Sequence, residues 1–408
     1  MIRSLNININ INKLKNSNHV FRFMVVIKEV LAKAIFDSRK EKTIEIRIVT
    51  DFGIFKASAP NGKSKGKNEA KPWKKSLEGD VKALNDFREY FSEDILEKFE
   101  DLKRVEDIVE GHVGANSLFA LESAVLKSMA KEQEKQIWQL INPQAKKIPR
   151  LVGNCVGGGK HSSSEKKPDF QEFLLIPNLK SAKEMVELNK KIKDKIKTSL
   201  KKTDAKFDGK KNDEGAWKTS LNDKEVLEVL DSAGVPLGMD VAASSFFKRK
   251  KYNYFNPVLK RDADEQFGYL SNLISNFGIF YIEDPFEEED FESFAKLLKK
   301  FPEVLIVGDD LTVTNPKRVK EAIEKKSVNA IIVKPNQTGS LRTVKEVCEI
   351  AKENGLKIVF SHRSGETGEN ILADLAFGFG ADFFKCGIDG FGREEKLKRL
   401  VEIERGLV

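Results

Sequence analysis

The sequence predicts an α/β fold in which a (β/α)₈-like barrel follows a smaller α+β domain. Two observations predict it. In the back half of the chain, short apolar runs recur about every 25 residues, which is the length of a strand, a loop and a helix. In the front half, segments of alternating polarity come first and helical segments follow them. Strands followed by helices are typical of an α+β unit.

Six apolar runs in the back half end in an ionisable residue. A buried parallel strand has both faces covered, so its sequence is continuously apolar. Helical patterns such as Pro316–Lys326 and Leu341–Asn354 lie between the runs. Units of this kind close into a barrel whose chemistry lies at the C-terminal ends of the strands. The runs are Val235–Asp240, Ile279–Glu283, Val304–Asp309, Ala330–Lys334, Ile358–His362 and Asp382–Lys385.

The domain boundaries follow from these patterns. We expect residues 24–147 to form an N-terminal α+β capping domain, with an alternating strand at Thr43–Thr50 and a helix at Asn116–Lys131. We expect residues 148–408 to form the catalytic barrel. Residues 1–23 begin with an Asn/Ile alternation and lack the apolar core of a secretory signal, so we expect a disordered extension there.

Composition limits the classes of partner. The 408 residues carry a formal net charge of +8 and no apolar run that approaches a membrane span. Much of the positive charge lies in Lys190–Lys202 and Lys206–Lys211, which we interpret as a solvated helix face. These runs lack interleaved aromatic residues, so we do not expect nucleic-acid binding. The three cysteines have no metal-type spacing, which fits a reducing cytoplasm.

Three of the strand ends are acidic. Asp240, Glu283 and Asp309 follow separate runs, and carboxylates gathered at one barrel mouth repel each other unless a cation lies between them. Hard oxygen ligands in this number suit Mg²⁺. The structural alternative is that each acid caps the following helix, because Asp is a common N-cap residue.

The remaining strand ends are basic. Lys334 and Lys385 would face the same mouth, where a divalent ion and a second ammonium group lower the pKa of a lysine and allow it to act as a base. The alternative is that each lysine only pairs with an acid. The segment Ser361–Thr367 adds His362, Arg363 and Ser364, and an arginine beside a hydroxyl group suits a phosphate or carboxylate. Together these residues predict a site for a small, multiply anionic acid whose α-proton is removed.

Four further residues stand out in the sequence. Glu172 begins an apolar run, and a buried glutamate needs a partner or a raised pKa. His161 follows a glycine-rich segment that either holds an anion or forms a tight turn. Ser64 lies between two glycines in a loop that is either a surface loop or closes around a ligand. Glu214, in a polar segment, reads by itself as an ordinary turn residue.

Four segments then resemble one family. IEDPF, GDDLTVTNPKR, KPNQTGS and SHRSGET, in this order and spacing, are similar to motifs of the enolases, and the likeness runs from about residue 24 to the C-terminus. The resemblance implies an enolase-type barrel that departs from regular βα order at its start. It also implies reversible dehydration of 2-phosphoglycerate to phosphoenolpyruvate, two Mg²⁺ ions, and a homo-oligomer that is a dimer or a ring of dimers.

The resemblance also implies roles for residues. Lys334 would be the base at C2 of the substrate, and Glu214, assisted by Glu172, the acid that helps the C3 hydroxyl leave. The implied metal ligands are Asp240, Glu283, Asp309 and Ser64. The implied substrate-binding residues are His161, Glu172, Glu283, Asp309, His362, Arg363, Ser364 and Lys385.

Four segments depart from the usual enolase motifs. DSRKEKT stands for DSRGNPT, NDEGA for GDEGG and GGGKH for NGGSH, and KCGIDGFGREEKL is longer than KTGAPARSERL. These departures leave two alternatives to enolase activity. One is a superfamily paralog that abstracts the α-proton of another 2-hydroxy acid. The other is a non-catalytic, enolase-like binding protein.

Overall fold

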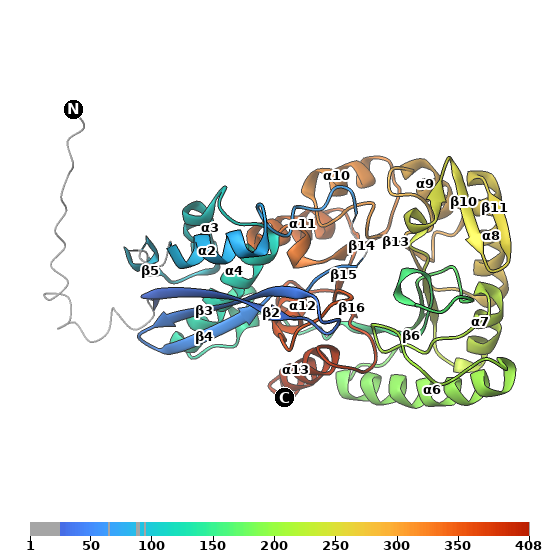
Figure 1. Ribbon diagram of the computed structural model, residues 1–408, viewed down its shortest axis with the longest axis horizontal. Coiled ribbons are helices and arrows are strands. Elements are labelled where there is room, and N and C mark those ends of the chain that lie inside the picture. The colour runs from blue at the N-terminus through green and yellow to red at the C-terminus, as the bar shows by residue number, and fades with distance from the viewer. Residues whose placement is uncertain (1–24, 64–65, 87–89, 94, 408) are drawn as a thin grey trace, which may run out of the picture.

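The computed structural model describes residues 25–63, 66–86, 90–93 and 95–407. The predicted extension at residues 1–23 and the candidate ligand Ser64 lie outside these residues. Figure 1 shows the N-terminal part, in blue and cyan, beside a larger part that runs from green to red.

The N-terminal part is built on an antiparallel sheet of three strands in the order β2-β3-β4. Alternate residues of β3 are buried, so one face of the sheet packs against the long helix α4. The sheet strands are β2 (Glu29–Phe36), β3 (Lys42–Thr50) and β4 (Gly53–Ser58). The other elements are β1 (Val25–Val26), its partner β5 (Ile95–Leu96), α2 (Leu77–Asp86), α3 (Leu102–Val109), α4 (Ala115–Glu132) and α5 (Ile137–Ile141).

The larger part is a closed barrel of eight strands in the order β12-β13-β14-β15-β16-β6-β7-β8. The six predicted runs all form barrel strands, which confirms the predicted barrel. The strands are β6 (Arg150–Gly157), β7 (Glu172–Leu175), β8 (Leu237–Asp240), β12 (Tyr281–Glu283), β13 (Leu305–Gly308), β14 (Ala330–Val333), β15 (Lys357–Ser361) and β16 (Phe383–Lys385).

Helices surround the barrel (Figure 1). Polar side chains cap the N-termini of several of them. Asn222, Asp262 and Ser340, for example, cap α7, α8 and α11 through their side chains. The helices are α6 (Ala182–Thr203), α7 (Asp223–Leu230), α8 (Ala263–Phe277), α9 (Phe291–Lys300), α10 (Pro316–Glu324), α11 (Leu341–Glu353), α12 (Ile371–Gly378) and α13 (Arg393–Arg405). Along the chain, β8 is followed by a small sheet of β9 (Phe247–Lys248), β10 (Lys251–Phe255) and β11 (Val258–Arg261), and α8 comes next.

One strand of the barrel runs backwards. β7 pairs antiparallel with both β6 and β8, and two helices, α6 and α7, follow it before β8 begins. The equal βα units suggested by the spacing therefore do not hold at the start of the barrel. Because β7 is reversed, its first residue lies where the other strands end: Glu172 is level with Asp240 in the pairing. This reversal brings a glutamate to the barrel mouth.

The barrel interior is packed rather than open, as in other barrels of this size. Its core contains buried side chains from the barrel strands and the segments beside them: Val152, Leu174, Ile176, Tyr281, Leu305, Val307, Ala330, Ile332, Val359 and Phe383. The chemistry is therefore confined to the mouth above this layer.

Loops of the N-terminal part reach the barrel mouth. Asn61 forms two backbone hydrogen bonds with Gly365, at 2.8 and 2.9 Å. Asn336 donates to Asn116 of α4 at 2.9 Å. The first part of the chain thus contributes directly to the surroundings of the predicted site.

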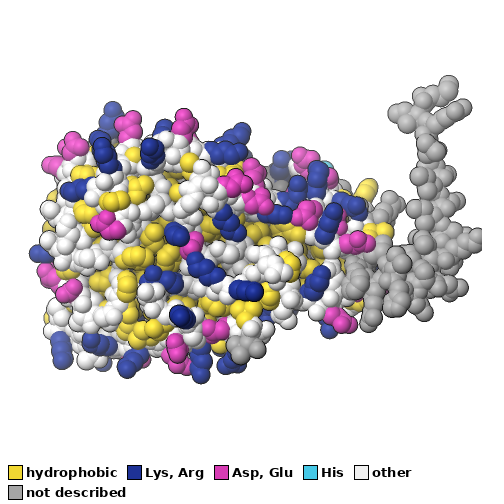
Figure 2. Space-filling view, turned by 180° about the vertical axis from the view of Figure 1, so that it is seen from behind, with side chains coloured by type: hydrophobic (Ala, Val, Ile, Leu, Met, Phe, Trp, Pro, Cys, Tyr) yellow, Lys and Arg dark blue, Asp and Glu magenta, His cyan; other side chains and the backbone are white. Residues whose placement is uncertain are grey.

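The surface of the molecule is mixed in charge. On the face shown in Figure 2, basic and acidic side chains are interspersed and do not form one block of a single sign. In the part of the chain that the structure describes, no helix combines the length and apolar character needed to cross a bilayer.

Candidate active site

A buried lysine stands at the centre of the barrel mouth. Lys385, the last residue of β16, places its Nζ 2.8 Å from Asp240 Oδ2 and 2.8 Å from Glu283 Oε1. Glu172 Oε1 lies 3.4 Å from the same nitrogen. Burial lowers the pKa of Lys385, but these acids outweigh it and raise the pKa well above its ordinary value. Lys385 is therefore a fixed positive charge.

The second lysine, Lys334, directly follows β14 and pairs with Asp309 Oδ2. Burial lowers the pKa of Lys334, and Arg363 and Lys385 lower it too, whereas Asp309 and Glu283 raise it; the net direction is upward. Cation binding at these two carboxylates would cancel the raising contributions. Burial and the two neighbouring positive charges would remain, and both lower the pKa as a base requires.

The three predicted metal ligands come to one mouth but not to one point. Asp240 and Glu283 meet at Lys385, while Asp309 meets Lys334. Among the described residues, two groups have ligand atoms close enough to share an ion: Asp284, Asp309 and Asp310, and His161, Glu172 and Glu214. Asp284 accepts hydrogen bonds from the backbone nitrogens of Asp309, at 2.9 Å, and Asp310, at 2.8 Å, so it positions that turn.

The electrostatics of the acids fit a divalent cation. Burial raises the pKa of Glu283 to about 8, and the charges of Asp240 and Asp309 push in the same direction. The three carboxylates therefore repel one another within a buried space. All are hard oxygen donors of the kind that Mg²⁺ prefers.

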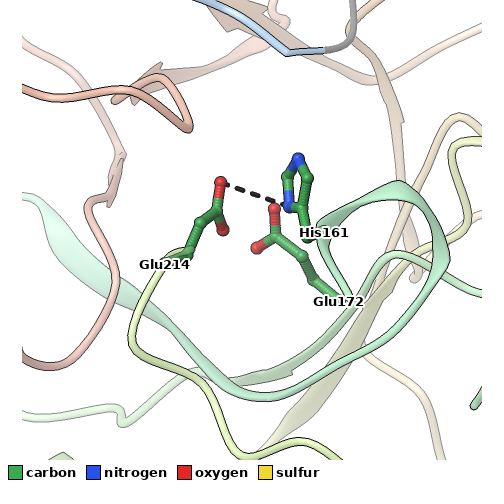
Figure 3. A group of neighbouring side chains, drawn as sticks. All are labelled: His161, Glu172 and Glu214. Atoms are coloured by element: carbon green, nitrogen blue, oxygen red, sulfur yellow. Dashed lines mark ion pairs between the residues drawn. The ribbon is translucent and has the colours of Figure 1, made fainter. Parts of the chain in front are cut away.

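A second group of side chains lies beside this one. His161, Glu172 and Glu214 come from three different segments and point toward one another in Figure 3. His161 Nδ1 lies 3.3 Å from Glu214 Oε1, and Asn154 of β6 donates to Glu214 Oε2 at 3.0 Å. His362 Nε2 lies 3.8 Å from the same Oε2.

The two glutamates in this group differ in their pKa. Burial raises the pKa of Glu172 well above its ordinary value, and the charge of Glu214 adds to this shift. Burial also raises the pKa of Glu214, but His161 and His362 outweigh it and hold that pKa well below its usual range. Burial lowers the pKa of His362 well below its ordinary value, and the charge of Glu214 opposes this shift. The pair can thus hold one proton, with Glu172 as its favoured location.

The residues predicted to bind an anion, Arg363 and Ser364, lie in the loop after β15. Arg363 is buried and forms a bidentate ion pair with Glu69, at 3.1–3.2 Å. Ser364 Oγ accepts hydrogen bonds from Arg39 Nη1 and from the backbone nitrogen of Lys63, both at 2.8 Å. Glu69 and Lys63 belong to the same loop as Ser64, residues 59–70, so the described parts of this loop lie over the site.

This loop leaves little room in the mouth. The enclosed space among Glu172, Glu214, Lys334, Arg363 and Lys385 is about 20 Å³, enough for roughly one water molecule. Ion pairs from Lys67 to Glu287, at 2.8 Å, and from Lys63 to Asp213, at 2.7 Å, hold the loop on the barrel. The enclosed space is too small for a three-carbon acid.

Comparison with known proteins accounts for nearly the whole described chain. The family model for the enolase C-terminal TIM barrel domain matches residues 145–407, and that for the enolase N-terminal domain matches residues 27–141. The chain belongs to the enolase family. It is 34% identical to an enolase of Pyrobaculum aerophilum, with 92% of this chain and 96% of the relative covered. It is 35% identical to an enolase of Methanosphaera stadtmanae, with 94% and 98% covered.

Two of the departures from the enolase motifs compensate for each other. Gly157 stands where enolases usually have an asparagine, and Asn212 stands where they usually have a glycine. A Cβ atom on Gly157 would lie 2.1 Å from Asn212 Nδ2, so a larger residue at position 157 would clash with the amide of Asn212. Asn212 Oδ1 also accepts hydrogen bonds from Glu214 N, at 3.0 Å, and from Ala216 N, at 2.9 Å.

Two residues of this enolase site were not found from the sequence. Arg39 and Glu69 lie in the N-terminal part, far along the chain from their partners Ser364 and Arg363. Arg39 stands in DSRKEKT, one of the segments that depart from the usual enolase motifs. Its Nε is buried with no hydrogen-bond partner among the described residues.

Proposed function

We propose that this chain catalyses the Mg²⁺-dependent, reversible dehydration of 2-phosphoglycerate to phosphoenolpyruvate. The observation that carries the proposal is the placement of base and acid. Lys334 follows β14 and Glu172 begins β7. In the ring of eight strands, these two are separated by β15, β16 and β6 in one direction and by β13, β12 and β8 in the other. They therefore stand on opposite sides of whatever the mouth holds.

This arrangement suits an elimination. Lys334 takes the proton from C2 on one side. On the other side, the glutamates supply a proton to the C3 hydroxyl, which leaves as water. Bound Mg²⁺ supplies positive charge that stabilises the negative charge developing on the substrate carboxylate. Lys385 binds that same carboxylate through its ammonium group.

We assign the acid role to Glu214, with Glu172 holding the proton that it uses. Burial and the neighbouring charge of Glu214 favour protonated Glu172. Asn154 and His161 orient the Glu214 carboxyl group. His161 and His362 line the pocket beside it.

We assign Asp240, Glu283 and Asp309 to one Mg²⁺ ion, which would displace Lys385 and Lys334 from their present partners. A second ion, arriving with the substrate, would use Ser64 of the closing loop. The repulsion among the three buried carboxylates supports the first assignment.

Magnesium affinity should depend on pH. Because the pKa of Glu283 is about 8, a proton occupies this carboxyl at lower pH and must leave before a cation binds. Affinity should therefore rise by about tenfold per pH unit up to pH 8 and then level off. Calorimetric titration with Mg²⁺ from pH 6.5 to 9 measures this. An affinity that stays constant over that range would contradict the assignment of Glu283.

The phosphate end of the site comprises Arg363, Ser364 and, we add, Arg39. A guanidinium group that already donates to Ser364 Oγ at 2.8 Å and is almost fully buried is placed for an anion beside that serine. The Arg363 guanidinium group already forms an ion pair with Glu69, so the substrate phosphate would compete with this carboxylate for it.

Replacing Arg39 by methionine should weaken substrate binding. Loss of a charge-assisted hydrogen bond predicts a KM for 2-phosphoglycerate about 10- to 100-fold higher, with a smaller change in kcat. Lys40→Met is the matched control, because Lys40 is the exposed neighbour in the same turn. Equal effects in the two variants would show that Arg39 acts only through the fold of the turn.

We also propose a cytoplasmic homo-oligomer, either a dimer or a ring of dimers. The exposed side chains of Phe36 and Ile54 on the N-terminal sheet support an apolar contact between subunits. The three buried, free cysteines suit a reducing compartment.

The activity is tested by the rise of enol-ester absorbance from 2-phosphoglycerate, with Mg²⁺ and after chelation. A parallel screen of non-phosphorylated 2-hydroxy acids separates enolase activity from that of a superfamily paralog. Faster turnover of such an acid than of 2-phosphoglycerate would overturn the substrate assignment.

A further inference from the structure

One lysine of the basic helix α6 is not on its solvated face. The buried residues of α6 include Met185, Asn189, Ile192, Ile196 and Leu200, spaced three or four apart. Lys193 lies within the same stripe, and its side chain is only 2% exposed. The expectation that this charge run is a solvated face is therefore wrong at Lys193.

The buried ammonium group of Lys193 contacts the loop that carries Glu214. Its Nζ donates to the backbone oxygen of Gly215 at 2.5 Å and to Asp389 Oδ2 at 2.8 Å. Gly215 directly follows Glu214. The contact therefore lies one peptide unit away from the catalytic carboxyl group.

Asp389 belongs to the longer segment that replaces the usual enolase motif after β16. It accepts from Lys211 at 3.0 Å through its other oxygen, so one carboxylate joins two lysines. Gly215 has a φ of +80°, and a Cβ atom there would lie 2.7 Å from the backbone oxygen of Asp389. The two loops are thus in direct backbone contact.

Trp217 ties the far end of the Glu214 loop to the same lysine. Its indole nitrogen donates to the backbone oxygen of Lys193 at 3.0 Å, and Lys193 Nζ lies 5.5 Å from the ring centroid. The Trp217 backbone bonds to Cys155 at 2.9 Å and to Gly157 at 3.0 Å, both on β6. Residues 212–217 are therefore held between α6, β6 and the segment after β16.

Charged groups as well as the buried Trp217 support the back of this loop. A cleft of about 590 Å³ lies behind it, lined by Lys190, Asp194, Lys211, Asp213 and Asp389 among others. A buried ion pair adds little to stability compared with apolar residues of similar volume, but it fixes geometry. The contacts of Lys193 therefore fix the geometry of the loop more than they stabilise the fold.

We propose that Lys193, together with Asp389, is a positioning residue that holds the 212–217 loop so that Glu214 points at the C3 hydroxyl of the substrate. This inference rests on the proposed function. It predicts that loss of either charge harms the step at C3 and spares proton removal at C2, because Lys334 directly follows β14 and its ammonium group pairs with Asp309 instead.

The test uses the full chain with Mg²⁺ and 2-phosphoglycerate in D₂O. Lys193→Met and Asp389→Asn should each lower kcat for dehydration by about 10- to 100-fold, as misplacement of a catalytic group by about 1 Å does. Exchange of the C2 proton with solvent should stay within about twofold of the parent chain. Lys190→Met is the control, because Lys190 lies on the same helix and cleft but is exposed and pairs with Glu394.

Amide hydrogen exchange of residues 212–217 provides a readout that needs no activity. Exchange there should rise in both variants and not in the control. Parallel loss of dehydration and C2 exchange, or unchanged amide exchange, would overturn the proposal. If Lys193→Met does not fold, Asp389→Asn alone decides the test, because the Asp389 side chain is less buried than that of Lys193. A parent chain that is inactive would overturn the proposed function alone, since amide exchange still reports on the loop.

Discussion

Replacing Lys334 by alanine should abolish both C2 proton exchange and dehydration. A positioned base contributes about 10²–10⁴-fold to the rate of proton transfer, and both readouts require the C2 proton to leave. The substitution also leaves Asp309 buried without its ammonium partner. In the metal-free chain this should lower the free energy of unfolding by about 3–5 kcal/mol, and saturating Mg²⁺ should recover most of that loss.

Lys320→Ala is the matched control for this variant. Lys320 lies on α10, between β13 and β14, and its side chain is 63% exposed. Its removal deletes the same charge without touching the mouth, so turnover should be retained. C2 exchange that persists in Lys334→Ala, in a folded and Mg²⁺-loaded protein, would assign the base to another residue.

Replacing Glu214 by glutamine should separate the two steps of the reaction. The amide keeps the hydrogen-bond acceptor for Asn154 but cannot deliver a proton to the leaving hydroxyl. Dehydration should fall by about 10²–10⁴-fold, while exchange of the C2 proton with solvent continues. Proton NMR of 2-phosphoglycerate in D₂O follows both in one sample.

Asp213→Asn is the matched control for Glu214→Gln, since it removes the same charge one residue away. Asp213 is partly exposed and pairs with Lys63 of the closing loop. Its variant should change KM and leave the ratio of exchange to dehydration as it was. If Glu214→Gln lost exchange and dehydration together, Glu214 would not be the acid at C3.

Six of the barrel strands could be predicted because each comes from a short apolar run that leads into an ionisable residue. Asp240, Glu283 and Lys385 were all identified at strand ends for this reason. The reversed direction of β7 was not readable from its apolar run, since a strand has the same composition in either direction. Glu172 was noticed only as an anomaly, and the reversal explains it: the head of β7 lies at the mouth.

Other features depend on contacts that no local pattern encodes. Arg39 reaches Ser364, and Glu69 reaches Arg363, across most of the chain length. Lys193 was hidden in a run of lysines, although its position on the apolar stripe of α6 gave a usable signal. Gly157 and Asn212 show why a single departure from a motif misleads. The side chain of Asn212 lies where a side chain at position 157 would lie, so the two departures must be considered together.

The central claim is that the acids of this mouth bind a divalent ion and that Lys334 then takes hydrogen from carbon. The most direct measurement is proton NMR of 2-phosphoglycerate in D₂O with the full chain, before and after Mg²⁺ is added. The account predicts that deuterium enters C2 and that vinyl protons of phosphoenolpyruvate grow only once the metal is present. A folded, metal-loaded chain that leaves the C2 proton in place would contradict it.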